Sequence, residues 1–196
     1  AQAMFGIVQG GTDVALRLEH AAELASLSAG GRGFEGLALG GFSVGEPIPA
    51  MYEVLSAIAH QVDPARPRYL MGVGTPEDIL EAVARGIDMF DCVMPTRNGR
   101  HGTAFTRYGA INLANARHAD DPRPLDETSP HAAARTYSRA YLHHLFKGKE
   151  MLASTLATIH NEHFIVGLVA NIRQSMIDGT YWDFKQEFLG RYTAGM

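Results

Sequence analysis

A few residues of this sequence could do covalent or recognition chemistry, and they stand at the ends of short apolar segments. Asp91 lies in the string Gly-Ile-Asp-Met-Phe-Asp-Cys-Val-Met-Pro-Thr-Arg, between Phe90 and Cys92. A carboxylate with such neighbours at a strand end would be partly desolvated, and it could act as a nucleophile. The alternative is a structural role, in which the carboxylate accepts hydrogen bonds from nearby backbone. Asp88, three residues earlier, fits a turn.

Two glycine pairs and one glutamine could recognise a flat ligand. Gln9 precedes Gly10-Gly11, and Gly40-Gly41 follows the next apolar segment. Glycine lets backbone N–H and C=O groups approach a ligand closely, and a glutamine amide offers both a donor and an acceptor. The combination would match the edge of a guanine-like base. Each feature alone is also typical of a tight turn between a strand and a helix.

The segment Thr96–Gly102 predicts a loop that carries two arginines and a histidine. Guanidinium groups suit bidentate contacts with phosphate, and the glycines would let the backbone come close to such a ligand. Residues 97–149 hold nine Lys/Arg against four acids, in a chain of formal charge −4. This excess predicts a surface that faces a polyanion, although a solvated surface without a partner is the alternative. Four histidines would add polar contacts there: His101, His118, His143 and His144.

The bulk composition limits the class of protein. The chain has 196 residues, of which 46% are hydrophobic, as in an ordinary globular core. Its single cysteine, Cys92, excludes an internal disulfide and fits a reducing compartment. No apolar run approaches the roughly 18 residues of a membrane span, and no charged-then-apolar leader opens the chain. We therefore expect a cytoplasmic protein that does not enter a membrane.

Four strand-and-helix repeats must position the candidate residues. Apolar segments predict strands at 4–9, 36–42, 68–73 and 89–93. Helical spacing predicts helices at 13–28, 49–61 and 76–86. Thr12 or Asp13 would cap the first helix, and Thr75 with Pro76 would begin the third. Such repeats predict a parallel sheet with ligands at the carboxyl ends of its strands, in either a barrel or a doubly wound fold.

The pattern changes after Pro95. Residues 103–107 and 110–113, joined at Tyr108-Gly109, predict a β-hairpin. Residues 114–134 are polar, contain proline and predict irregular structure. Helical periodicity then continues to the end of the chain and predicts helices at 138–147, 150–177 and 181–191.

Taken together, five strings of the sequence resemble the bacterial tRNA-guanine transglycosylases, in that family's order and at its spacing. They are Phe5-Gly-Ile-Val-Gln-Gly10, Leu39-Gly-Gly-Phe-Ser-Val-Gly-Glu46, Tyr69-Leu-Met-Gly-Val-Gly74, Gly86-Ile-Asp-Met-Phe-Asp-Cys-Val-Met-Pro-Thr-Arg97 and Ser138-Arg-Ala-Tyr-Leu-His-His144. The resemblance covers the whole chain. It implies an α/β fold, namely the C-terminal half of a (β/α)8 TIM barrel followed by a β-hairpin and a C-terminal helical subdomain. The implied divisions are 1–102 for the last four βα units, 103–137 for the hairpin and a degenerate zinc loop, and 138–196 for the C-terminal helices.

The resemblance also implies an activity. A transferase of this kind replaces guanine at the anticodon wobble position of tRNA with a 7-deazaguanine of the preQ1/queuine pathway, through a covalent bond between Asp91 and the ribose. The implied base-binding residues are Gln9, Gly40, Gly41, Phe42, Glu46, Tyr69 and Met71. The implied tRNA-contacting residues are Gly72, Val73, Gly74, Thr75, Pro76, Glu77, Asp78, Thr96, Arg97, Asn98, Gly99 and Arg100. Val44 favours the smaller bacterial precursor over queuine as the incoming base.

The chain departs from the family at its metal site. The resemblance implies a structural zinc ion held by three cysteines and a histidine. The three cysteine positions here are Ser129, His131 and Ala134, and only His160 keeps its place. Two histidines fall short of a closed tetrahedral site, so we expect no metal or other cofactor. The loop at 126–137 should then be mobile, because structural zinc contributes folding free energy.

The chain is also shorter than a complete barrel of about 250 residues. The resemblance assigns a second catalytic aspartate to the half that is missing here. The sheet edges at 4–9 and 89–93 would be exposed, so we expect pairing with an N-terminal half, a second copy or a full-length homologue, besides tRNA and the base. The alternatives are a non-catalytic tRNA-binding or partner subunit, and a fragment or engineered half barrel.

Overall fold

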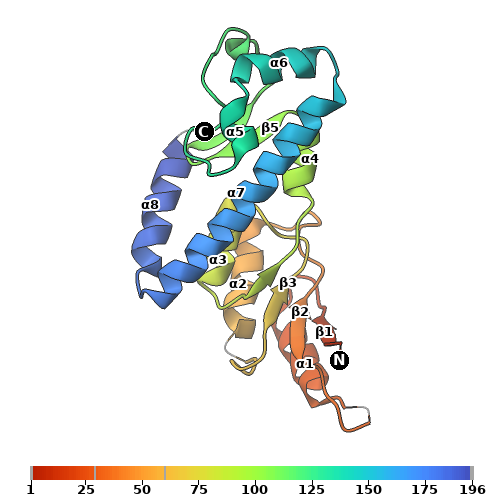
Figure 1. Ribbon diagram of the computed structural model, residues 1–196. Coiled ribbons are helices and arrows are strands. Elements are labelled where there is room, and N and C mark those ends of the chain that lie inside the picture. The colour runs from red at the N-terminus through yellow and green to blue at the C-terminus, as the bar shows by residue number, and fades with distance from the viewer. Residues whose placement is uncertain (1, 29, 60, 195–196) are drawn as a thin grey trace. The chain divides into compact units, whose positions relative to one another are not determined.

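The computed structural model describes residues 2–28, 30–59 and 61–194, which form two compact units (Figure 1). Unit 1 extends to Cys92, and unit 2 begins at Val93. The division predicted from the sequence into 1–102, 103–137 and 138–196 stays a prediction.

Unit 1 consists of four strands that alternate with three helices. In chain order they are β1 Phe5–Val8, α1 Val14–Ser26, β2 Gly36–Leu39, α2 Ile48–Ala59, β3 Arg68–Leu70, α3 Pro76–Val83 and β4 Met89–Phe90. All strand pairs are parallel, and the strands are neighbours in the order β1-β2-β3-β4. The predicted parallel sheet is confirmed. The strands are shorter at their carboxyl ends than predicted, because the chain there turns into the loops that carry the candidate residues.

The core of unit 1 lies between the sheet and its helices. Val8 and Leu70 of the strands are completely buried, as are Val54 and Leu55 of α2. Burying a side chain of this size stabilises the fold by about 1.5–3 kcal/mol. Ile7 points to the opposite face from Val8, because side chains alternate along a strand, and it is 42% exposed.

Local capping explains where two of these helices begin. The carboxylate of Asp13 accepts a hydrogen bond from Leu16 N at 3.0 Å, so Asp13, and not Thr12, caps α1. The hydroxyl of Thr75 accepts one from Asp78 N at 3.1 Å, and α3 then begins at Pro76, as predicted. Asp and Thr at the N-cap satisfy N–H groups that have no partner within the helix.

Unit 2 contains a hairpin and several helices. They are α4 Met94–Arg100, β5 Thr103–Thr106, β6 Gly109–Asn112, the 3-10 turn η1 Ala116–His118, α5 Ala132–Thr136, α6 Arg139–Lys147, α7 Met151–Ile177 and α8 Tyr181–Ala194. The antiparallel hairpin and the helices α6, α7 and α8 confirm the predictions. A second core joins the hairpin to α6 and α7 through Leu113, Leu142 and Ala157. Within the described residues, no helix is long and apolar enough to cross a membrane.

The predicted loop at 96–102 is wrong, because most of it forms α4. Its sequence is poor in helix formers, and packing against α7 provides the stabilisation instead. Gly99 lies so close to α7 that an added Cβ would meet the Oγ1, N and Cα atoms of Thr158 at 2.6–2.8 Å. The buried Asn161 of α7 donates to Pro95 O at 3.0 Å and Thr103 O at 2.9 Å, and accepts from Phe105 N at 2.9 Å. Residues 114–134 are also less irregular than predicted, since they include η1 and the beginning of α5.

Candidate active site

Asp91 directly follows β4, and one of its two carboxylate oxygens is held in place. Oδ1 accepts hydrogen bonds from the Tyr69 hydroxyl at 2.6 Å and from Gly72 N at 2.8 Å. Gly72 has a φ of 73°, a left-handed conformation that favours glycine. Within the described ranges, no residue donates a hydrogen bond to Oδ2. The loop after β3 therefore fixes the carboxylate and leaves one oxygen open.

The environment of Asp91 is more open than the sequence suggested. Asp91 itself is exposed, whereas Phe90 and Cys92 are half-buried, so the expected partial desolvation is wrong for this chain. The hydrogen bond to Asp91, followed by burial and the aspartate charge, raises the pKa of Tyr69 to about 12. Tyr69 is therefore a phenol at neutral pH and can donate its proton to the carboxylate. The sequence pointed to Tyr69 beside a base but not to this bond.

The predicted base-binding groups Gln9 and Gly40-Gly41 lie side by side at the carboxyl ends of β1 and β2. A Cβ atom added to Gly40 would lie 2.5 Å from Gln9 Nε2, and one added to Gly41 would lie 2.8 Å from Gln9 Oε1. Each glycine thus provides the space that the Gln9 amide occupies. Gly41 also needs to be glycine for its backbone, since its φ is 75°.

Arg17 of α1 ties these two strand ends together, and the sequence reasoning missed it. Its side chain is completely buried and donates to Gly11 O at 2.6 Å, Val8 O at 3.2 Å and Gly40 O at 2.8 Å. The guanidinium carbon lies 4.0 Å from the centroid of the Phe42 ring. Burial lowers the pKa of Arg17, and the charge of Glu46 partly opposes that effect. A signal was present in the sequence, because an arginine stands on the apolar side of the predicted helix, three residues after Val14.

Glu46 organises the turn that follows Phe42. Its carboxylate accepts hydrogen bonds from Ser43 N at 2.6 Å and Val44 N at 3.0 Å. Burial would raise the pKa of Glu46, but these backbone donors outweigh it and the pKa is lowered. Ser43 has a φ of 59°, a conformation that few residues other than glycine adopt. The implied role of Glu46 in base binding stays a prediction, although its carboxylate does hold the backbone of this turn.

In the predicted tRNA segment at 72–78, Thr75 caps α3 and residues 76–78 form its first turn. Val73, Gly74 and Pro76 are buried. Asp78 accepts a hydrogen bond from the Tyr52 hydroxyl at 2.7 Å, and burial and that bond raise the pKa of Tyr52. Contact of this segment with tRNA stays a prediction, with Gly72 as its exposed member.

The basic segment of unit 2 is only partly available to a polyanion. Arg97 and Arg100 of α4 are exposed, whereas Gly99 is buried against α7, so its lack of a side chain serves helix packing. His118 and His143 are 3% and 8% exposed, which makes the expectation that they contact a polyanion wrong.

An ion-pair network uses two further cations of that segment. Arg123 donates to the buried Asp121 from Nε at 2.9 Å and from Nη2 at 2.7 Å. Arg139 donates to Pro124 O and Leu125 O, both at 3.2 Å, and lies 3.7 Å from Asp121. The Arg123 guanidinium holds the pKa of Asp121 well below its usual range. These arginines therefore hold the segment at residues 121–125 against the beginning of α6.

The positions that the resemblance assigns to zinc do not provide a ligand set for it. His160 lies with Nε2 2.6 Å from Phe105 O, and the Nδ1 atom of His131 accepts a hydrogen bond from Ala133 N at 3.2 Å. The His131 ring stacks on His163 at 3.9 Å. In the part of the chain that the structure describes, no three His, Cys, Asp or Glu side chains are grouped so as to hold a metal. Structural zinc requires four ligands, so the residues present do not fit it.

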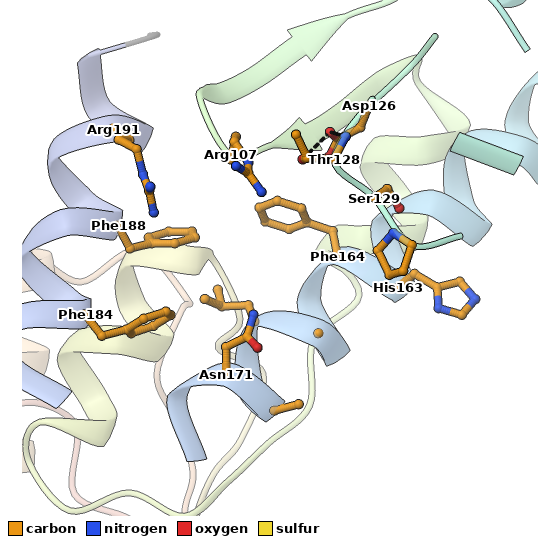
Figure 2. Close-up of a pocket in the computed structure, with 14 residues that line it drawn as sticks. Arg107, Asp126, Thr128, Ser129, His163, Phe164, Asn171, Phe184, Phe188 and Arg191 are labelled. Atoms are coloured by element: carbon orange, nitrogen blue, oxygen red, sulfur yellow. Dashed lines mark hydrogen bonds between the residues drawn. The ribbon is translucent and has the colours of Figure 1, made fainter. Parts of the chain in front are cut away.

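A hollow of about 320 Å³ lies in unit 2, and the residues that line it do not include those predicted to bind the base (Figure 2). Phe164, Phe184 and Phe188 form its apolar wall, and Arg107 and Arg191 reach toward them. The site residues of unit 1 lie instead at the carboxyl ends of the parallel strands.

Comparison with known proteins identifies the family of the chain. The profile of the family described as queuine tRNA-ribosyltransferase matches residues 1–194. A queuine tRNA-ribosyltransferase of Mesorhizobium japonicum is 55% identical over 180 residues, which cover 92% of this chain and 46% of that protein. The enzyme of that name from Sorangium cellulosum is 51% identical over 196 residues, covering 100% of this chain and 48% of the relative. One from Rhizobium meliloti is 52% identical over 194 residues, covering 99% and 50%.

The chain thus spans about half the length of the curated relatives that it matches. The match of the family profile nevertheless extends over almost every residue, and the identity of the relatives exceeds one half. The chain belongs to the queuine tRNA-ribosyltransferase family.

Proposed function

We propose that this chain takes part in tRNA base exchange, in which guanine at the wobble position is replaced by a 7-deazaguanine. The observation that carries the proposal is the arrangement of Asp91. One oxygen is fixed by Tyr69 and Gly72, and the other is open at the sheet edge where Gln9 and Gly41 lie. The names of the relatives support tRNA as the substrate.

The proposed reaction has two displacements. Oδ2 of Asp91 forms a bond to C1′ of the guanosine while the bond from C1′ to N9 of guanine breaks, and the electron pair leaves with guanine, which takes up a proton. N9 of the incoming 7-deazaguanine, losing its proton, then attacks C1′ and the bond to Asp91 breaks. Two inversions retain the configuration at C1′, and the protons balance. The resemblance assigns the acid–base group to the N-terminal half of the barrel.

The proposed architecture for the assembled enzyme is a (β/α)8 barrel to which unit 1 contributes four βα units. The strands lie in chain order, and Ile7 is exposed on the sheet face that a closed barrel would cover. In the same proposal, Arg97 and Arg100 contact tRNA phosphates, Met71 lies beside the base, and the chain dispenses with structural zinc. Its partner is an N-terminal half or another copy of the chain.

A covalent-adduct assay tests the proposed function. The chain is incubated with tRNA and labelled guanine, alone and with an N-terminal half, and the products are separated on a denaturing gel. We expect a protein–tRNA adduct that Asp91→Asn removes. Asp88→Asn is the matched control, because Asp88 accepts a hydrogen bond from Arg68 N at 2.8 Å and has no part in the proposed reaction.

Two outcomes would contradict the proposal. An adduct that survives Asp91→Asn would assign the nucleophile elsewhere. Binding of tRNA by the wild-type mixture without any adduct would favour the non-catalytic subunit.

A further inference from the structure

We infer that Arg17 is a positioning residue that sets the direction of the Gly41 N–H group, so that this group meets a carbonyl oxygen on the edge of the bound base. The inference rests on the proposed function and deepens it, since it names what makes the site select an oxo-purine.

Arg17 joins the two strand ends that carry the base-binding groups. From α1, it donates to Val8 O, the last residue of β1, at 3.2 Å and to Gly40 O, just after β2, at 2.8 Å. A third bond, to Gly11 O at 2.6 Å, fixes the loop that follows Gln9. A buried cation needs such partners, because leaving its charge or donors unsatisfied is costly. The planar guanidinium can satisfy three carbonyls at once, which a lysine ammonium cannot do with the same geometry.

The bond to Gly40 O determines where Gly41 N–H points. In a trans peptide, the C=O of one residue and the N–H of the next lie in one plane and point in opposite directions. The structure contains no cis peptide among the residues it describes. Because Gly40 O points at the buried Arg17, Gly41 N–H points away from it, and Gly41 is exposed. Within the described part of the chain, this N–H has no hydrogen-bond acceptor.

Two neighbours hold this peptide in the same orientation. The Phe42 ring lies 4.0 Å from the guanidinium carbon, and a cation over a ring face is attracted to it. Glu46 fixes two backbone N–H groups just beyond Phe42, those of Ser43 and Val44. The φ of 75° at Gly41 allows the turn between these two anchors. The peptide is thus preorganised before any ligand arrives.

The hydrogen-bonding groups at this site suit a base with a carbonyl group. Gly41 N–H is a fixed donor, and the Gln9 amide beside it offers a donor and an acceptor. A 6-oxo group, as in guanine and 7-deazaguanine, would accept from Gly41 N–H. A 6-amino group would place donor against donor, and a buried donor left unpaired weakens binding. Arg17 therefore acts on specificity without touching the base.

The first test needs no ligand. In the ¹⁵N-labelled chain, residual dipolar couplings and relaxation dispersion report the direction and the exchange of Gly41 N–H. We expect one fixed orientation in the wild type, exchange broadening at Gly40–Gly41 in Arg17→Met, and an intermediate result in Arg17→Lys. Arg85→Met is the matched control, because Arg85 also stacks on an aromatic ring, that of Tyr52 at 4.6 Å, without contacting the two glycines. An unchanged Gly41 in folded Arg17→Lys would overturn the inference.

The second test measures base exchange by the chain together with an N-terminal half, with guanine and 2,6-diaminopurine as competing bases. We expect Arg17→Met to raise KM for guanine about tenfold, the value of one lost hydrogen bond, with kcat changed less. Its preference for the 6-oxo base should fall in proportion, with Arg17→Lys between the two. A purely structural role would lower the amount of active enzyme and leave both KM and the preference unchanged.

The outcomes separate the two claims. If the wild-type mixture exchanges bases and folded Arg17→Lys and Arg17→Met keep both KM and base preference, the inference about Arg17 is overturned and the proposed function stands. If the wild type exchanges no base while Gly41 still loses its orientation in Arg17→Met, the proposed function fails. In that case Arg17 orients the peptide for another ligand.

Discussion

The hydrogen bond between Tyr69 and Asp91 couples a phenol to a carboxylate across two strands of the sheet. Both of the donors to Asp91 come from β3 or the loop that follows it, so the carboxylate is oriented by the neighbouring strand and not by its own. The negative charge and the acceptor oxygen stabilise the protonated phenol, which is why the pKa of Tyr69 is raised to about 12.

Asp91→Asn should therefore lower the pKa of Tyr69 toward the ordinary value of about 10. The substitution removes the charge and weakens the acceptor, so the phenolate becomes less unfavourable. Titration of the Tyr69 ring carbon signal by NMR would show a protonated phenol through pH of about 11 in the wild type. Asp88→Asn serves as the control. A Tyr69 titration that is identical in wild type and Asp91→Asn would mean that the bond does not exist in solution.

Tyr69 and Arg17 show what residue-by-residue reading of the sequence could not supply. Asp91, Gln9 and the Gly40-Gly41 pair could be chosen because their residue types and their places at strand ends suggested chemistry. The partners that hold them come from far along the chain: Tyr69 is 22 residues from Asp91, and Arg17 is 23 residues from Gly40. Such pairs depend on strand order and register, which side-chain periodicity does not determine.

At the level of elements, α4 and α7 pack against each other in unit 2. This joint depends on Gly99, which has no side chain. Gly99 lets the backbone of α4 approach the backbone of α7 at Thr158. Asn161 adds three hydrogen bonds across the same joint. α4 carries the exposed Arg97 and Arg100, so the joint also places the proposed tRNA contacts.

Gly99→Ala should destabilise unit 2. The new methyl group would meet backbone atoms of Thr158 at 2.7–2.8 Å, and a helix backbone cannot yield as a flexible side chain can. We expect a loss of about 1–3 kcal/mol in the free energy of unfolding, measured by urea denaturation. Gly167→Ala is the matched control: it lies within α7 with no atom near its Cβ position, so it should be neutral or stabilise by up to about 1 kcal/mol. Equal effects of the two substitutions would show that the joint is not close-packed.

The helices differ in how far local sequence predicts them. α3 could be placed because its capping threonine and first proline act within one turn. α4 could not, because its sequence, MPTRNGR, favours a loop and only the packing against α7 makes it a helix. The parallel sheet followed from the repeat of strand and helix, but its consecutive strand order did not.

At the scale of the whole molecule, charge decides how the chain responds to acid. Hydrogen bonds and charge from Arg123 lower the pKa of Asp121, while burial lowers the pKa of His118, which lies 3.6 Å from Asp121. A depressed carboxylate pKa contributes stability above the unfolded value of about 4, and this is lost as the pH falls. A histidine held neutral by burial contributes stability above about pH 6.5, and this is lost as the pH falls below that value.

Both groups thus act in the same direction, in two pH windows. We expect the free energy of unfolding, from urea titrations between pH 3 and pH 7, to fall first below about pH 6.5 and again below about pH 4. His118→Gln should reduce the first fall and leave the second, and Asp121→Asn should reduce the second. Burial also lowers the pKa of His160, so part of the first fall should remain in His118→Gln. A single fall that neither substitution alters would assign the acid sensitivity to other groups.

The consecutive order of the four strands also affects when the sheet can form during synthesis of the chain. Each strand after β1 pairs with the one made just before it, as in the pairs of Phe5 with Gly36 and of Tyr69 with Met89. Among the described strands, β1 alone waits for a later strand, β2, before it finds its first neighbour. The sheet can therefore grow while the chain is still being synthesised, one βα unit at a time, because each new strand finds its partner already made. A chain that began with more βα units could add them to the free edge of β1 without disturbing any pair already formed.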